Sequence, residues 1–156
     1  IWAMSDNFIS VTPKTGNQTT AHHANVGGVR LALEGLRNGH PIGFFPAGAM
    51  SFGNARGEVL DRPWTHSVIR LIRKAGVPVY PVYFDFRNSR FFYGLGWISW
   101  KIRTLRVAAE AFNKRGRTAE VYVGTPIDPD VIRSYTDDVA LADFLYRRTY
   151  ALPKED

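Results

Sequence analysis

The chain has 156 residues, of which 45% are hydrophobic and 22% are charged, so it is long enough to bury the core of one domain. It has no cysteine and no apolar run as long as a membrane span, which excludes disulfides and thiolate chemistry. The net charge of +6 favours anionic partners such as phospholipid surfaces, nucleic acid or phosphorylated small molecules. Because the chain opens with Ile1-Trp2, we expect it to be part of a longer protein.

The first elements in chain order are a predicted strand, a loop and a helix. Residues 7–12 are rich in strand formers, and the polar residues 14–24 are typical of an exposed loop. Asn25 is a suitable N-cap for a helix that Asn38-Gly39 ends. Four apolar residues recur in that helix at helical spacing: Val26, Val29, Leu33 and Leu36.

The next element is predicted to be a buried central strand that leads into a candidate site. The apolar run Ile42–Phe45 stops at Pro46, and mostly small residues follow from Ala47 to Gly53. Small residues let a substrate approach the backbone, and open α/β sheets bind ligands beyond the carboxyl ends of their strands. No Lys precedes Ser51, so the turn is not a nucleotide-binding loop. The alternative is a plain tight turn between sheet and helix.

Two arginines, Arg56 and Arg62, lie in the predicted loop 51–63, which would overhang this turn. An arginine fork suits a phosphate group, so either residue is a candidate for binding an anionic substrate. Pairing with Glu58 and Asp61 on a solvated loop explains the same residues equally well.

The middle of the chain is predicted to form an amphipathic helix and another strand. The helix covers residues 64–75 and ends at Gly76. The strand covers residues 77–84, although Pro78 and Pro81 interrupt its ladder. One face of the helix is apolar and is expected to point inward: Trp64, Val68, Leu71, Ile72 and Ala75.

The last part of the chain is predicted to be irregular over residues 85–96, helical over 97–114 and extended over 119–123. Thr136 is expected to cap a final helix that has acidic residues in its first turn and arginines near its end. The inward residues of the helix over 97–114 are predicted to be Ile98, Ile102, Leu105, Ala109 and Phe112.

These elements alternate as strand and helix along the whole chain. Such alternation indicates an α/β fold with a mostly parallel sheet and helices on both faces. Because we see no internal repeat or linker, residues 1–156 are predicted to form a single domain.

The outer face of the predicted helix 97–114 carries Trp100, Arg103, Val107 and Lys114. Tryptophan beside basic residues suits a membrane interface. Packing of the aromatic residues in the core, or against an N-terminal segment that this chain lacks, is an equally good interpretation. The same mixture suits single-stranded nucleic acid, but no nucleic-acid-binding motif is present, so no nucleic-acid partner is expected.

Two further patterns point to chemistry that we do not assign. Gly48–Gly53 resembles a nucleophile elbow but is one residue out of register, and His66 lies on the polar face of its helix. His22-His23 has no cysteine or clustered carboxylate to complete a metal site. We therefore expect no metal, no other cofactor and no catalytic residue within this chain.

Two blocks resemble the glycerolipid (lysophospholipid) acyltransferase family. Phe45–Ser51 is similar to the family's F-P-E-G-T-R-S block, and Val77–Val82 is similar to its later V-P-x-x-P-V block. The order and spacing of the two blocks also fit, and residues 8–124 run in family-like order. The chain looks most like the hemolysin-like acyltransferase branch, in which the Glu and Arg of the first block are commonly small or apolar.

The resemblance implies transfer of a fatty acyl group from acyl-CoA or acyl-carrier protein to a lysophospholipid or similar lyso-lipid. It also implies a cytoplasmic protein at the inner face of the membrane. The family's H-x-x-x-x-D signature lies upstream of the F-P block, and no histidine here has Asp five positions later. This chain is therefore expected to be the C-terminal, larger part of an acyltransferase-like α/β domain and to be inactive alone. It would supply the acceptor-binding wall: Phe45, Pro46, Gly48 and Ser51, with Arg56 or Arg62 on phosphate. A non-catalytic lipid- or anion-binding module is the alternative.

Overall fold

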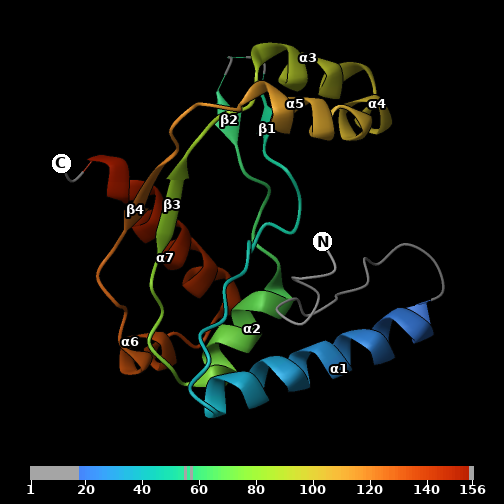
Figure 1. Cartoon of the computed structure of the whole chain (residues 1–156). Helices are drawn as coiled ribbons and strands as arrows, with labels where there is room; N and C mark the ends of the chain where they lie inside the picture. The colour runs from blue at the N-terminus through green and yellow to red at the C-terminus, as the bar shows by residue number, and fades with distance from the viewer. Residues whose placement is uncertain (1–17, 55, 57, 155–156) are drawn as a thin grey trace. The chain divides into compact units, whose positions relative to one another are not determined.

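The computed structural model describes residues 18–54, 56 and 58–154, and the chain divides into two compact units (Figure 1). The first unit ends at Phe44, and the second runs from Phe45 onward. The strand expected over residues 7–12 lies outside the described residues.

The first unit contains one long helix, α1 (Gln18–Arg37). Its end agrees with the sequence prediction, because Gly39 follows with a φ of 79° and donates its N–H to the Leu36 carbonyl. Its start does not agree, because α1 begins at Gln18 instead of Asn25. The predicted loop over 14–24 is therefore wrong from residue 18 onward. Neither Pro nor Gly interrupts residues 18–24, so nothing stops the helix from extending through them.

The predicted central strand Ile42–Phe45 is absent. These residues have no regular secondary structure and no strand partner among the described residues. Phe44 and Phe45 are 41% and 78% exposed, so the run is not buried either. An apolar run indicates burial only if a neighbouring strand satisfies its backbone, and none is in place here.

The second unit contains two pairs of short strands. β1 (Phe52–Gly53) pairs with β2 (Val59–Leu60), and β3 (Val82–Asp85) pairs with β4 (Glu120–Val123). Both pairs are antiparallel, and Val79 and Ile127 form one further antiparallel bridge. The predicted parallel sheet with helices on both faces is therefore wrong. The strand patterns at 82–84 and 119–123 were recognisable, but a pattern of side chains does not report the direction in which two strands pair.

The core of the second unit lies between three helices. These are α2 (His66–Ala75), α6 (Pro129–Ser134) and α7 (Asp138–Ala151). Helix α2 ends at Gly76, whose φ is 63°, as the sequence predicted. The buried residues of this core come from these helices and from the bridge at residue 127: Ile69, Ile72, Ile127, Ile132, Leu141 and Leu145.

Acidic residues fix the starts of α6 and α7. Asp128 caps α6, and Asp137 caps α7 by accepting a hydrogen bond from the backbone N–H of Ala140. The cap of α7 is thus one residue later than the predicted Thr136. Asp138 ties α7 to α2, because its carboxylate lies 2.8 Å from Arg70 Nε and 2.6 Å from Arg73 Nη2.

Three helices replace the single helix predicted over residues 97–114. They are α3 (Arg90–Ile98), α4 (Trp100–Leu105) and α5 (Val107–Asn113), and they are joined at Ser99 and Arg106. Residues 90–96, predicted to be irregular, are helical because the Ser89 side chain caps α3 at Phe92 N. Four of the five predicted inward residues are exposed: Ala109, together with Ile102 by 47%, Leu105 by 83% and Phe112 by 79%.

We expect Leu141→Ala to destabilise the second unit by about 2–5 kcal/mol, because Leu141 is completely buried between the helices. Val139→Ala on the same helix is the matched control, since Val139 is 59% exposed and its truncation should change stability by less than about 0.5 kcal/mol. Urea unfolding of both variants measures the difference. Equal losses would show that the α2–α6–α7 core is wrongly placed.

Candidate functional site

The site starts from a tight turn at Phe45–Gly48. The Gly48 N–H donates to the Phe45 carbonyl at 3.0 Å, and Pro46 supplies the fixed φ that suits the second position of a turn. Gly48 has a φ of 61°, a conformation that glycine adopts without strain. Thr65 holds the turn from the other side, because its backbone N–H and its hydroxyl both donate to the Pro46 carbonyl, at 3.0 and 3.2 Å. The turn is thereby fastened to the start of α2.

An open apolar surface lies beside this turn. The Phe45 ring lies 6.1 Å from the ring of Phe84, on β3. In the β3–β4 ribbon, Val82 pairs with Val123 and Phe84 pairs with Val121, so these four side chains share one face. All four are 39–66% exposed. We call these four residues and Phe45 the open ribbon face.

The opposite face of the ribbon is covered by aromatic side chains. Tyr83 and Tyr122 pair across the ribbon, and Tyr83 packs edge-on against Tyr150 of α7, with 5.4 Å between the ring centroids. Tyr150 stacks on Tyr146 at 4.3 Å, and Tyr146 meets Trp64 next to α2. One face of the ribbon is therefore packed on α7, while the other is free for a ligand.

The aromatic cluster also holds the segment that carries Arg62. Burial raises the pKa of Tyr150, and so does a hydrogen bond to Asp61. This bond anchors Asp61 on α7, one residue before Arg62. The Arg62 guanidinium lies over the Phe52 ring, 5.7 Å from its centroid, and Phe52 directly follows Ser51. Arg62 therefore lies at the base of the β1–β2 hairpin, next to the end of the candidate turn.

Arg56 lies at the other end of that hairpin. Its backbone N–H donates to the Asn54 side chain at 3.0 Å, and Asn54 also binds Glu58, which closes the hairpin tip. The structure therefore joins Phe45, Pro46 and Gly48 in one turn and places Arg62 on Phe52, next to half-buried Ser51, whereas Arg56 lies at the hairpin tip. Pro81 begins the strand segment as a proline should, with its carbonyl accepting the Gly124 N–H at 2.9 Å.

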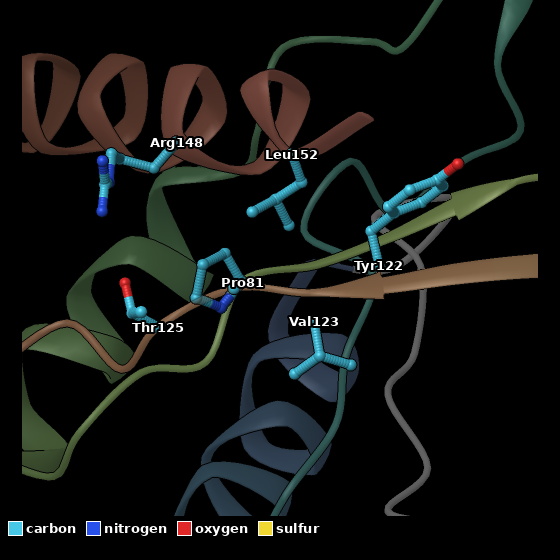
Figure 2. Close-up of a pocket in the computed structure, with 7 residues that line it drawn as sticks. Pro81, Tyr122, Val123, Thr125, Arg148 and Leu152 are labelled. Atoms are coloured by element: carbon cyan, nitrogen blue, oxygen red, sulfur yellow. The ribbon is translucent and has the colours of Figure 1, made fainter. Parts of the chain in front are cut away.

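A pocket of about 300 Å³ lies between the ribbon and the end of α7 (Figure 2). Leu152 and Pro81 form its apolar part, whereas the Arg148 guanidinium and the Thr125 hydroxyl lie together at one end. Arg148 forms no salt bridge with any residue that the structure describes. This mixture of one cation and apolar walls suits a small anionic amphiphile.

The described residues hold no cluster of three or more His, Asp or Glu side chains that could bind a metal ion. His40 and His66 are exposed, and His66 lies on α2 among solvated residues, as the sequence indicated. Neither histidine faces a carboxylate in a hydrogen bond that the structure records. We therefore assign the role of general base to neither His40 nor His66.

Sequence reasoning missed Thr65, Phe84 and the Asp61–Tyr150 pair. Thr65 was readable as a helix N-cap, but its bond to Pro46 joins positions nineteen residues apart. Phe84 lay in a predicted strand, without any signal for which face is open. The signal available for the aromatic cluster was the spacing of Tyr146 and Tyr150, which are four positions apart and therefore lie on one face of their helix.

Comparison with known proteins finds two similar relatives. A lyso-glycine lipid O-acyltransferase of Bacteroides thetaiotaomicron is 34% identical over 104 residues, which is 63% of this chain and 38% of the relative. A protein of the same name from Phocaeicola vulgatus is 31% identical over 104 residues, 63% of this chain and 37% of the relative. No family model matches the chain, and no solved structure matches it significantly. The similarity agrees with the resemblance to acyltransferases of lyso-lipids in general.

The Asp61–Tyr150 pair predicts a pH dependence of stability. Because the folded state raises the pKa of Tyr150, it holds the phenol proton more tightly than the unfolded chain does. Stability is then fully present below the ordinary tyrosine pKa of about 10 and falls as pH rises above it. We expect Tyr150→Phe to cost about 1 kcal/mol at neutral pH and to flatten this alkaline decline.

Urea unfolding between neutral pH and about pH 11 measures both effects. Tyr80→Phe is the control, because Tyr80 is 59% exposed and should leave the alkaline decline unchanged. If the stability of Tyr150→Phe falls as steeply at alkaline pH as that of the wild type, the Tyr150 phenol does not hold Asp61 by a hydrogen bond.

Proposed function

We propose that this chain is the acceptor-binding part of an acyltransferase that acts on a lyso-lipid. One observation carries the proposal: the turn at Phe45–Gly48 meets the open ribbon face at the Phe45–Phe84 contact, and Arg62 lies over Phe52, a few residues farther along the same segment. An apolar strip that ends near a cation is complementary to a lipid with an acyl chain and an anionic head group. The two similar lyso-glycine lipid O-acyltransferases support the same class of acceptor.

The proposed reaction joins the acceptor hydroxyl to a fatty acyl group. The hydroxyl oxygen forms an ester bond with the thioester carbonyl carbon of acyl-CoA or acyl-carrier protein. The carbon–sulfur bond breaks, and the hydroxyl proton leaves with the released thiol. A general base must accept that proton first, and the family's upstream His–Asp pair would supply it. The residues described here bind and orient the acceptor, and no step is assigned to them as acid or base.

The open ribbon face would bind the acyl chain that the lyso-lipid already carries. When the acyl chain covers these exposed apolar side chains, binding is stabilised by about 25 cal/mol per Å² of apolar area removed from water. The Arg62 fork would bind a phosphate or carboxylate of the head group, since both accept paired hydrogen bonds. Arg56, at the hairpin tip, is the weaker of the two arginine candidates. The protein is proposed to work in the cytoplasm at the inner membrane surface, where lyso-lipids reside.

A non-catalytic lipid-binding module is the second candidate. It is favoured by the lack of any H-x-x-x-x-D pair in this sequence. The two candidates share the acceptor site and differ only in acyl transfer.

Steady-state acyl transfer by the protein expressed from its whole reading frame tests the proposal. With an anionic lyso-lipid, we expect Arg62→Ala to raise the acceptor KM about 10-fold or more, because a charge-assisted hydrogen bond is worth about 1.5–3 kcal/mol. The KM of the acyl donor should not change. Arg62→Lys should restore part of the affinity, because it keeps the charge and loses the fork.

Arg147→Ala is the matched control, since Arg147 pairs with Asp143 on the exposed side of α7. An unchanged acceptor KM in Arg62→Ala would remove Arg62 from the site. If the wild-type protein binds the lyso-lipid but transfers no acyl group from acyl-CoA or from acyl-carrier protein, that result would contradict the enzymatic function and support the non-catalytic binding module.

A further inference from the structure

The positive charge of the chain is concentrated in one segment. Residues 86–118 hold eight of the chain's 20 basic residues and one of its 14 acidic residues, so their formal charge is +7. The rest of the chain therefore sums to −1, although the whole chain carries +6. This segment forms helices α3, α4 and α5, which lie together at one end of the second unit (Figure 1). We call residues 86–118 the basic lobe.

The single acidic residue of the basic lobe is used internally. Glu110 is only 4% exposed, and its carboxylate accepts hydrogen bonds from the Ser89 hydroxyl at 2.6 Å and the Ser89 N–H at 3.0 Å. These bonds hold the pKa of Glu110 below its ordinary value. Lys114 bonds to Asn88 and lies over the Phe86 ring, 4.5 Å from its centroid. This side of α5 is thus fixed against the start of α3.

The other side of α5 and the end of α4 expose large apolar side chains. Phe112 is two positions from Glu110, so the two side chains point to opposite sides of the helix. Phe112 is 79% exposed and Leu105 is 83% exposed, while Ile102 lies one turn before Leu105 and is 47% exposed. Exposed apolar groups of this size on a helix pair mark an interaction surface.

Arginines accompany these apolar residues. Arg106, between α4 and α5, lies over the Phe91 ring at 4.6 Å from its centroid, and Phe91 is itself 58% exposed. Five arginines of the basic lobe are exposed: Arg87, Arg90, Arg106, Arg115 and Arg117. None of the five forms a salt bridge with a residue that the structure describes. Arg87, Arg90, Arg115 and Arg117 can therefore bind an external anion, and Arg106 can do so beside the Phe91 ring.

We propose that the basic lobe docks the protein on an anionic lipid bilayer, with Leu105 and Phe112 inserted at the interface and the arginines on lipid phosphates. Amphipathic helices bind membranes through buried apolar area and attraction to anionic lipids, and each basic residue near such a surface contributes about 1 kcal/mol. No described helix is long and apolar enough to cross a bilayer, so the contact is interfacial. The inference extends the proposed function, because a lyso-lipid acceptor must be taken from a membrane.

Vesicle sedimentation tests the docking surface without any acyl transfer. We expect the wild-type protein to bind vesicles of phosphatidylcholine with about one-third phosphatidylglycerol, and to bind pure phosphatidylcholine at least about tenfold more weakly. Leu105→Glu and Phe112→Glu should each weaken binding to the anionic vesicles about tenfold or more, since each variant places a charge at the apolar interface. High salt should weaken binding further.

Val139→Glu is the matched control, because Val139 on α7 is 59% exposed and lies outside the basic lobe. It should bind vesicles as the wild type does. Circular dichroism of all three variants shows whether they fold. If Arg115→Gln with Arg117→Gln, a pair of exposed polar changes, leaves binding to anionic vesicles unchanged, the electrostatic part of the proposal is wrong.

Three results would overturn the proposal. The first is no vesicle binding by the wild-type protein at low salt. The second is self-association that Leu105→Glu abolishes, which would make this surface an interface between copies. The third is binding to a single-stranded oligonucleotide that is tighter than binding to anionic vesicles. Vesicle binding by a protein that transfers no acyl group would support the docking surface and contradict only the proposed enzymatic function.

Discussion

The candidate site depends on the Pro46 carbonyl, which accepts two hydrogen bonds from Thr65. Thr65 begins α2, and α2 is packed into the buried core with α6 and α7. A loop without regular structure is in this way fixed to the buried core of the second unit. The turn then needs no strand to support it. Small residues and one glycine at positive φ leave its outer surface open to a ligand.

The same core also determines which face of the β3–β4 ribbon is open. Tyr83 and Tyr150 close one face, whereas the apolar side chains of the other face stay 39–66% exposed, with the Phe45 ring beside Phe84. Asp61 is held by Tyr150 in the same cluster and places Arg62 near the turn. An aromatic cluster that makes no contact with the proposed ligand therefore orients both the apolar and the charged part of the site.

The sequence predicted the ends of helices better than it predicted which strands pair and in which direction. The ends of α1 and α2 at Gly39 and Gly76 were correct, because a glycine at positive φ is a local signal. The parallel sheet was wrong, because the direction of β3 and β4 depends on the long segment between them. The helix over 97–114 was wrong for a related reason. Its apolar residues had helical spacing, but nothing in the spacing tells whether a face meets the core or the solvent, and Leu105 and Phe112 meet solvent.

The site residues divide in the same way. Phe45, Pro46 and Gly48 could be proposed from the sequence, because a turn of small residues after an apolar run is visible there. The choice between Arg56 and Arg62 required the hairpin, whose two ends separate residues that are six apart. The open ribbon face could be recognised only from the structure, because it combines Phe45 with residues of two distant strands, β3 and β4.

Hydrogen exchange with a lyso-lipid below its critical micelle concentration tests whether these residues form the acceptor site. We expect bound lyso-lipid to slow exchange of the backbone amides at residues 45–53, 82–85 and 120–123, and to leave those of α6 unchanged. Protection confined to other parts of the chain, or none at saturating lyso-lipid, would contradict the proposed acceptor site.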